Sequence, residues 1–108
     1  MAFSVNLYYA GDDSNARRFA EEMMSSGTVD AIRSEPGNLR YEYFSSLEDP
    51  NTVLLIDSWE NQASLDTHHE SPMMQTIMNL REKYGLRVTA ERFMTDEEGF
   101  SAKDESFL

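Results

Sequence analysis

The chain has 108 residues, no cysteine and a formal net charge of -11 at pH 7. This length fits one compact domain, and the lack of cysteine excludes disulfides and thiolate metal sites. The negative charge repels phosphate groups, so we expect neither nucleic acid nor an anionic membrane as a partner. No signal peptide is visible and no apolar run approaches the roughly 20 residues that cross a bilayer, so a soluble cytoplasmic protein is expected.

The N-terminal third predicts a strand followed by a helix. Residues 2–10 alternate in polarity, which is typical of a half-buried strand. Asp13 or Ser14 is placed to cap the helix that follows. Gly27 should break this helix, and a short second turn should end by Ser34, because Pro36 disfavours helix before it. The apolar stripe of the first helix consists of Ala16, Phe19, Ala20, Met23 and Met24.

The middle of the chain predicts a hairpin. A turn at residues 35–38 leads into a strand over residues 39–46, which carries Tyr41 and Tyr43. The next strand, over residues 52–60, is almost continuously apolar in its first half and is therefore expected to lie in the middle of the sheet. Because strand side chains alternate, Asp57 faces inward if Trp59 does.

The last third predicts two consecutive helices and a strand. Asn61 should cap a helix that carries His68 and His69, and Ser71-Pro72 should start the next. That helix has an apolar stripe and ends at Gly85, before a strand over residues 86–94.

This order of elements predicts an α+β fold, the ferredoxin-like βαββαβ pattern with a four-stranded antiparallel sheet. Several strands carry apolar side chains on both faces, so a second sheet from another subunit should cover the open face, and we expect a homodimer. We divide the chain into a domain over residues 1–95 and an acidic tail over residues 96–108. The tail has the composition of a solvated extension, yet Phe100, Phe107 and Leu108 suggest that it docks on the partner subunit.

Three stretches together resemble a known family: EPGNLRYEY, DPNTVLLIDSWEN and the pattern AxLDxHxxSPM. Over roughly residues 3–94 the chain is similar to the antibiotic biosynthesis monooxygenase (ABM) family, which forms dimeric α+β barrels. Members include cofactor-free quinol-type monooxygenases and relatives that process the autoinducer-2 signal. The resemblance places the family's Trp on Trp59 and its His on His68. Met73 stands where many members have a second His.

Haem-degrading relatives share the fold, the Trp and a strand-one Asn, which Asn6 matches. They also need a His in the second helix as an iron ligand, and the matching stretch, MMQTIMNL, has none. The haem interpretation therefore lacks its axial ligand.

His68 is the candidate catalytic base, since imidazole titrates near physiological pH. Trp59 would form a wall for a planar substrate. Asp57 would be costly to bury alone, so it either pairs with an arginine (Arg40, Arg87 or Arg92) or has a raised pKa. Further substrate-binding candidates are Asn6, Tyr41, Tyr43, His69 and Met73. The methionines expected in the core and in pocket walls are Met23, Met24, Met73, Met74 and Met78.

Three functions remain open. The first is a cofactor-independent monooxygenase that acts on a small planar phenol or quinol-like substrate, without metal or flavin. The alternative is an isomerase or processing enzyme for a small phosphorylated signalling metabolite, autoinducer-2-like, which would need Arg40 or Arg92 to point inward. The third is a non-catalytic small-molecule binding module, because one fold hosts many functions.

Overall fold

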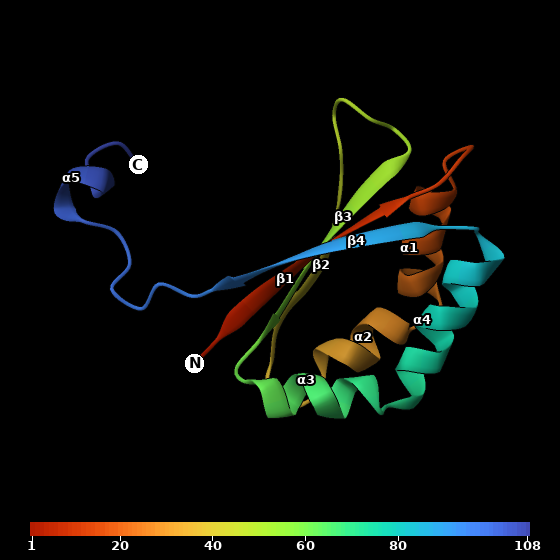
Figure 1. Cartoon of the computed structure of the whole chain (residues 1–108), viewed down its shortest axis with the longest axis horizontal. Coiled ribbons are helices and arrows are strands. Elements are labelled where there is room, and N and C mark those ends of the chain that lie inside the picture. The colour runs from red at the N-terminus through yellow and green to blue at the C-terminus, as the bar shows by residue number, and fades with distance from the viewer.

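The structure, a computed structural model, describes all 108 residues. Its elements are shown in Figure 1. In chain order they are β1 (Phe3–Ala10), α1 (Asn15–Ser25), α2 (Thr28–Arg33), β2 (Asn38–Ser45), β3 (Thr52–Trp59), α3 (Gln62–His69), α4 (Pro72–Lys83), β4 (Arg87–Met94) and α5 (Ala102–Glu105).

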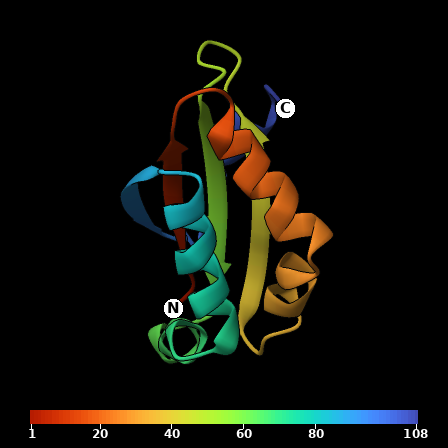
Figure 2. The same ribbon diagram turned by 90° about the vertical axis from the view of Figure 1, so that its right-hand side faces the viewer.

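The four strands form one antiparallel sheet in the order β2-β3-β1-β4. This confirms the predicted ferredoxin-like α+β fold, and β3 lies between two neighbours, as its apolar sequence indicated. Figure 2 shows that the helices α1 to α4 all lie on one face of the sheet. The core therefore forms between that face and the helices.

Helix boundaries follow the sequence signals, although the N-cap residues Ser14 and Ser71 make no side-chain cap bond. The Asn61 side chain accepts a hydrogen bond from Ser64 N at 2.9 Å, and Gly27 has a φ of 82° where α1 gives way to α2. Ser14 occupies the N-cap position of α1 but makes no side-chain cap bond. The predicted cap is wrong because Ser14 has a φ of 62°, whereas capping requires an extended backbone.

The core contains the inward side chains of the strands and the apolar stripes of the helices. Its largest fully buried side chains are Trp59, Phe3, Phe19, Met23, Ile32, Leu55 and Val29. Met73 and Met74 pack against this core, while Met24 and Met78 are about half exposed and line surface pockets. Methionines therefore lie both in contact with the core and in pocket walls, as expected from the sequence.

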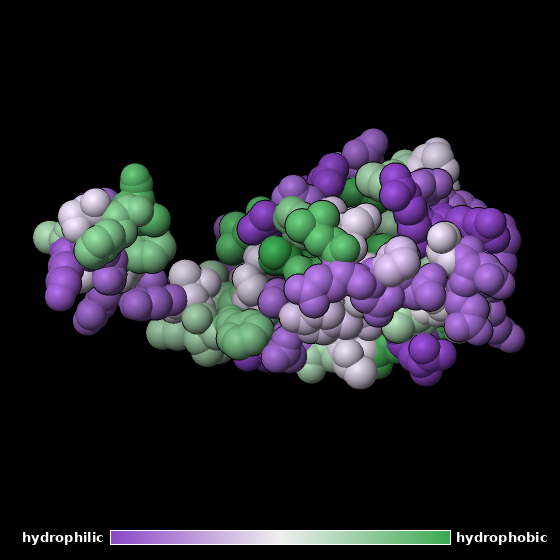
Figure 3. Space-filling model, turned by 90° about the horizontal axis from the view of Figure 1, so that it is seen from above, coloured by the Kyte–Doolittle hydropathy of each residue, from purple (hydrophilic) through white to green (hydrophobic).

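The opposite face of the sheet has no helix over it. Tyr8, Phe44 and Leu54 lie side by side there across three strands and are half-buried. Ile56 is also half-buried on this face, and Phe93 is 51% exposed. Figure 3, which views the molecule from above, shows hydrophobic side chains gathered near the middle of the body and on the tail.

The tail leaves the end of β4 and extends away from the body (Figure 1). Its short helix α5 begins at a capping box formed by Ser101 and Asp104. Phe100, Phe107 and Leu108 are each more than two-thirds exposed. None of the helices has the length and apolar character needed to cross a bilayer.

Candidate functional site

Trp59 and His68 lie against each other in the core. Trp59 is the last residue of β3, and α3 begins directly after the N-cap residue Asn61. His68 follows Leu65 on the inner side of that helix, one turn later. The indole and imidazole centroids are 5.0 Å apart with their planes 30° from parallel. Their residues are 0% and 3% exposed, so very little of the pair reaches solvent.

Asp57 belongs to the same group. Its Oδ1 accepts a hydrogen bond of 2.7 Å from Trp59 Nε1, which confirms that both residues face inward. Burial raises the pKa of Asp57 to about 7; the Trp59 bond lowers this pKa, and the charge of Glu35 raises it.

Of the two alternatives for Asp57, the structure shows the raised pKa, and the carboxyl makes no ion pair with Arg40, Arg87 or Arg92. Arg40 lies on the other face of β2 and binds Glu42. Arg92 stacks its guanidinium 3.8 Å from the Phe3 ring centroid and donates to Gln62 Oε1. Both cations thus remain near solvent, where they keep their hydration, and the buried carboxyl is left with a neutral donor.

Glu35 is a member of the site that sequence reasoning missed. Its Oε1 lies 2.7 Å from His68 Nδ1, and the two side chains are only 11% and 4% exposed. Glu35 stands in the turn before β2, 33 residues from His68. No local pattern marks this acid, because the contact arises only when α3 packs on the turn.

Tyrosine hydroxyls line the sheet side of the interior. The Tyr41 and Tyr43 oxygens are 3.5 Å apart, and the Tyr41 ring is 6.4 Å from the His68 ring. Tyr9 packs on Phe19 with centroids 4.8 Å apart. Burial is the largest cause that raises the pKa of Tyr9, Tyr41 and Tyr43, and the charge of Asp57 raises each further. These hydroxyls are therefore neutral donors at physiological pH.

Arg81 on α4 is the second residue that the sequence analysis missed. Its Nε is the one fully covered side-chain nitrogen or oxygen without a hydrogen-bond partner. The guanidinium is close enough to Tyr9 to lower the pKa of that phenol. An unpartnered buried N–H is costly, so this position favours an acceptor that the chain itself does not supply.

Three sequence candidates lie apart from this group or at its margin. Asn6 pairs with Ile56 on the open face, next to Tyr8, and so cannot reach Trp59. His69 is exposed, with its ring 5.8 Å from that of His68. Met73 is half-buried against the core. The residues that the structure brings together are Glu35, Tyr41, Tyr43, Asp57, Trp59 and His68.

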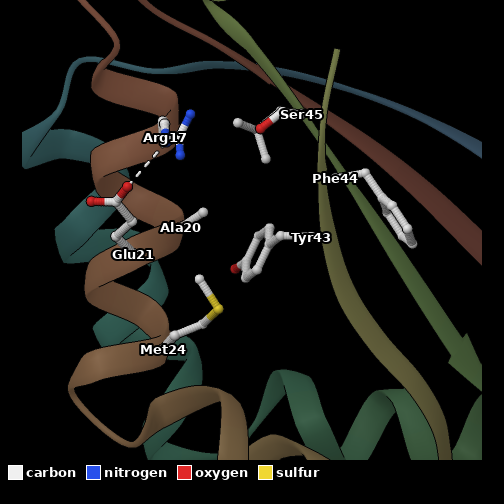
Figure 4. A pocket seen from close by; sticks show the side chains of 8 residues that line it. Arg17, Ala20, Glu21, Met24, Tyr43, Phe44 and Ser45 are labelled. Atoms are coloured by element: carbon white, nitrogen blue, oxygen red, sulfur yellow. Dashed lines mark hydrogen bonds and ion pairs between the residues drawn. The ribbon is translucent and has the colours of Figure 1, made fainter. Parts of the chain in front are cut away.

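A pocket of about 200 Å³ lies next to this group, between α1 and the β2–β3 hairpin. Figure 4 shows the Tyr43 side chain extending into it, toward Ala20 and Met24 of α1, with the Arg17–Glu21 hydrogen bond at its rim. Tyr43 thus links the pocket to Tyr41 and, beyond it, to His68. The structure holds no cluster of three or more His, Cys, Asp or Glu side chains that could bind a metal ion.

The family model for antibiotic biosynthesis monooxygenase matches residues 3–80. The chain therefore belongs to the ABM family. Solved structures with the same fold include SnoaB from Streptomyces nogalater, a cofactor-independent oxygenase, with a TM-score of 0.72 at 11% identity, covering 89% of this chain and 94% of that one. A protein from Nitrosomonas europaea that carries the family's name has a TM-score of 0.77 at 15% identity, covering 89% and 91%.

Two curated proteins match part of the chain. YcnE from Bacillus subtilis is 30% identical over 57 residues, which is 51% of this chain and 60% of YcnE. The uncharacterized protein sll1783 from Synechocystis is 33% identical over 49 residues, which is 45% of this chain and 33% of that protein. The matched regions thus span less than two-thirds of either relative.

Proposed function

We propose that the protein is a cofactor-independent monooxygenase for a small planar phenol or quinol-like substrate. The observation that carries the proposal is the buried contact between the Trp59 indole and the His68 imidazole. An indole offers a flat apolar surface for an aromatic ring, and the imidazole beside it offers a base. Membership of the ABM family supports monooxygenase chemistry in general, and the substrate class rests on this pair alone.

The reaction requires only a base and a dry cavity. Nε2 of His68, the ring nitrogen that does not contact Glu35, removes the phenolic proton. The resulting anion gives electrons to dioxygen, and a ring carbon forms a bond to oxygen. That carbon then loses its one hydrogen and retains one oxygen atom, so that the ring becomes a quinone, while the second oxygen atom leaves as water with this hydrogen and the phenolic proton. The substrate supplies every electron, so no bound metal or flavin is needed. Neutral tyrosine hydroxyls stabilise the developing negative charge.

Access to the pair runs through the pocket beside Tyr43. Trp59 is fully covered, so a substrate reaches it only when side chains between the pocket and the core move apart. Met24 is placed to move, since it is 48% exposed and methionine side chains adapt readily.

The test is oxygen uptake by the metal-free protein with a panel of quinols and phenols. We expect His68→Ala to lower kcat by roughly 10²–10⁴-fold, the usual contribution of a general base. His69→Ala removes the neighbouring exposed imidazole and is expected to keep the activity. Uptake that does not depend on His68 would contradict the proposed base, and no uptake with any member of the panel would favour a non-catalytic binding module.

A second candidate function is favoured by one observation, the unpartnered Nε of Arg81. A processing enzyme for a small phosphorylated metabolite needs a cation in its interior. Neither Arg40 nor Arg92 supplies it, because both are engaged near the surface. Binding of a phosphorylated sugar that is lost in Arg81→Gln would support this alternative.

We further propose that two copies pair through their open sheet faces and that the tail crosses onto the partner. The half-buried side chains around Leu54 and Ile56 support the first part, and the exposed apolar residues of the projecting tail support the second. We expect sedimentation to show a dimer for the full chain, monomers for Ile56→Asp, and a weaker dimer for a chain ending at Thr95. A truncated chain that dimerises as tightly as the full chain would contradict the role of the tail.

A further inference from the structure

The Glu35 carboxylate defines which nitrogen of His68 carries a proton. Oε1 of Glu35 is 2.7 Å from Nδ1, and both side chains are almost fully buried. An ionised carboxylate only accepts hydrogen bonds, so Nδ1 must donate. In a neutral imidazole the other nitrogen, Nε2, then carries the lone pair. The two ring nitrogens point in widely different directions, so Nε2 faces away from Glu35.

The turn that carries Glu35 is held on three sides. Glu35 N donates to Ile32 O at 3.0 Å, which ties the turn to α2. Glu60 N donates to Gly37 O at 2.8 Å, which ties it to the end of β3. Gly37 has a φ of 84°, and a Cβ there would collide with the Ser64 side chain at the start of α3. The turn and the helix that carries His68 therefore pack at a distance that only glycine permits.

We propose that Glu35 is the positioning residue for His68, fixing the Nδ1–H tautomer so that Nε2 is the proton acceptor. The proposal rests on the proposed function, because it assigns Glu35 a role in the reaction that His68 begins. When Nε2 takes the substrate proton the ring becomes a cation, and the adjacent carboxylate stabilises that cation. Such a pair orients the base and supports its charge while it touches no substrate atom.

The first measurement needs no activity. Ring ¹⁵N shifts measured at alkaline pH separate a protonated ring nitrogen from an unprotonated one. We expect His68 to show protonated Nδ1 and unprotonated Nε2. We expect Glu35→Ala to give a mixture of both tautomers. His69, exposed and without this carboxylate, is the internal reference in the same spectra. A wild-type His68 protonated at Nε2 would overturn the proposal.

The second measurement is oxygen uptake. Glu35→Ala should lower kcat by about 10²-fold or more, by analogy with other oriented histidine bases, and should leave KM within about threefold. Glu35→Gln retains an acceptor without the charge and should be intermediate. Glu42→Gln, which removes a surface carboxylate, should behave as wild type. Circular dichroism shows whether each variant is folded.

The outcomes separate the two proposals. A tautomer change without a loss of kcat would overturn the positioning role, even if the monooxygenase activity is present. A rise in KM with an unchanged kcat would also overturn the positioning role. If the wild-type protein consumes no oxygen with the whole panel, the proposed function fails, and the tautomer measurement alone then decides whether Glu35 holds the imidazole.

Discussion

Asp57→Asn is expected to stabilise the protein at pH 8 and to have less effect as the pH falls. The folded-state pKa of about 7 lies above the ordinary carboxyl pKa of 3.8, so the folded chain keeps this proton where the unfolded chain has lost it. The contribution of the protonated carboxyl to stability is complete below pH 3.8 and is lost as the pH rises toward 7. Above pH 7 the buried carboxylate is ionised and lowers the free energy of unfolding by the full cost of burying its charge. Asparagine is neutral, so the variant does not have this cost.

The expected size follows from the difference between the two pKa values. The difference between a folded-state pKa of about 7 and the ordinary 3.8 corresponds to a penalty of about 4 kcal/mol in the free energy of unfolding at pH 8, and of less than about 2 kcal/mol at pH 5. The stabilisation of the Asp57→Asn variant by these amounts is an upper bound, because the buried asparagine amide also needs a hydrogen-bond partner. Its carbonyl oxygen can still accept from Trp59 Nε1. Urea unfolding at both pH values measures the free energy, with the exposed Glu48→Gln as the control for net charge. An equal effect at both pH values would contradict the raised pKa.

Trp59→Ala is expected to lower the free energy of unfolding by about 3–5 kcal/mol, the range for large aromatic side chains deleted from a core. The side chain is fully buried and is the donor to Asp57, so the variant also removes a hydrogen bond from a buried carboxyl. For a domain whose total stability is typically about 5–15 kcal/mol, this change leaves the fold marginal.

Trp59→Phe separates the two contributions. Phenylalanine fills most of the space and supplies no N–H, so a smaller loss is expected, and it should grow as Asp57 ionises with rising pH. Circular dichroism follows the unfolding, because the only tryptophan is gone. If Trp59→Phe is as stable as the wild type at pH 8, the Nε1 bond does not support Asp57.

The fold could be predicted from the sequence because its signals are local. Alternation identified the strands, Asn61 and Gly27 marked helix boundaries, and the period of β3 correctly turned Asp57 and Trp59 to the same face. The β3–α3 junction is also short, so a helix capped at Asn61 places His68 over the strand that it follows.

The rest of the site depends on contacts between distant segments. Glu35 and Arg81 have no local signature, and each enters the interior only because α3 and α4 pack where they do. Asn6 is a different case, because it was a site candidate and lies outside the site. Its strand was identified, and the alternation of β1 already places Asn6 on the face opposite Leu7 and Tyr9, so its candidate role came from the family resemblance and not from the strand pattern.

The central side chains of the site come from one continuous stretch, running from Glu35 through β2 and β3 to His68. The α1 and α2 helices pack against β3 and β2 and form the cover above that stretch. Substitutions in the covering helices would therefore change the shape of the space beside Trp59 and leave the Glu35–His68 pair unchanged. Under the proposed function, the residues that react with the substrate and the residues that set the shape of its site therefore belong to separate segments of the chain.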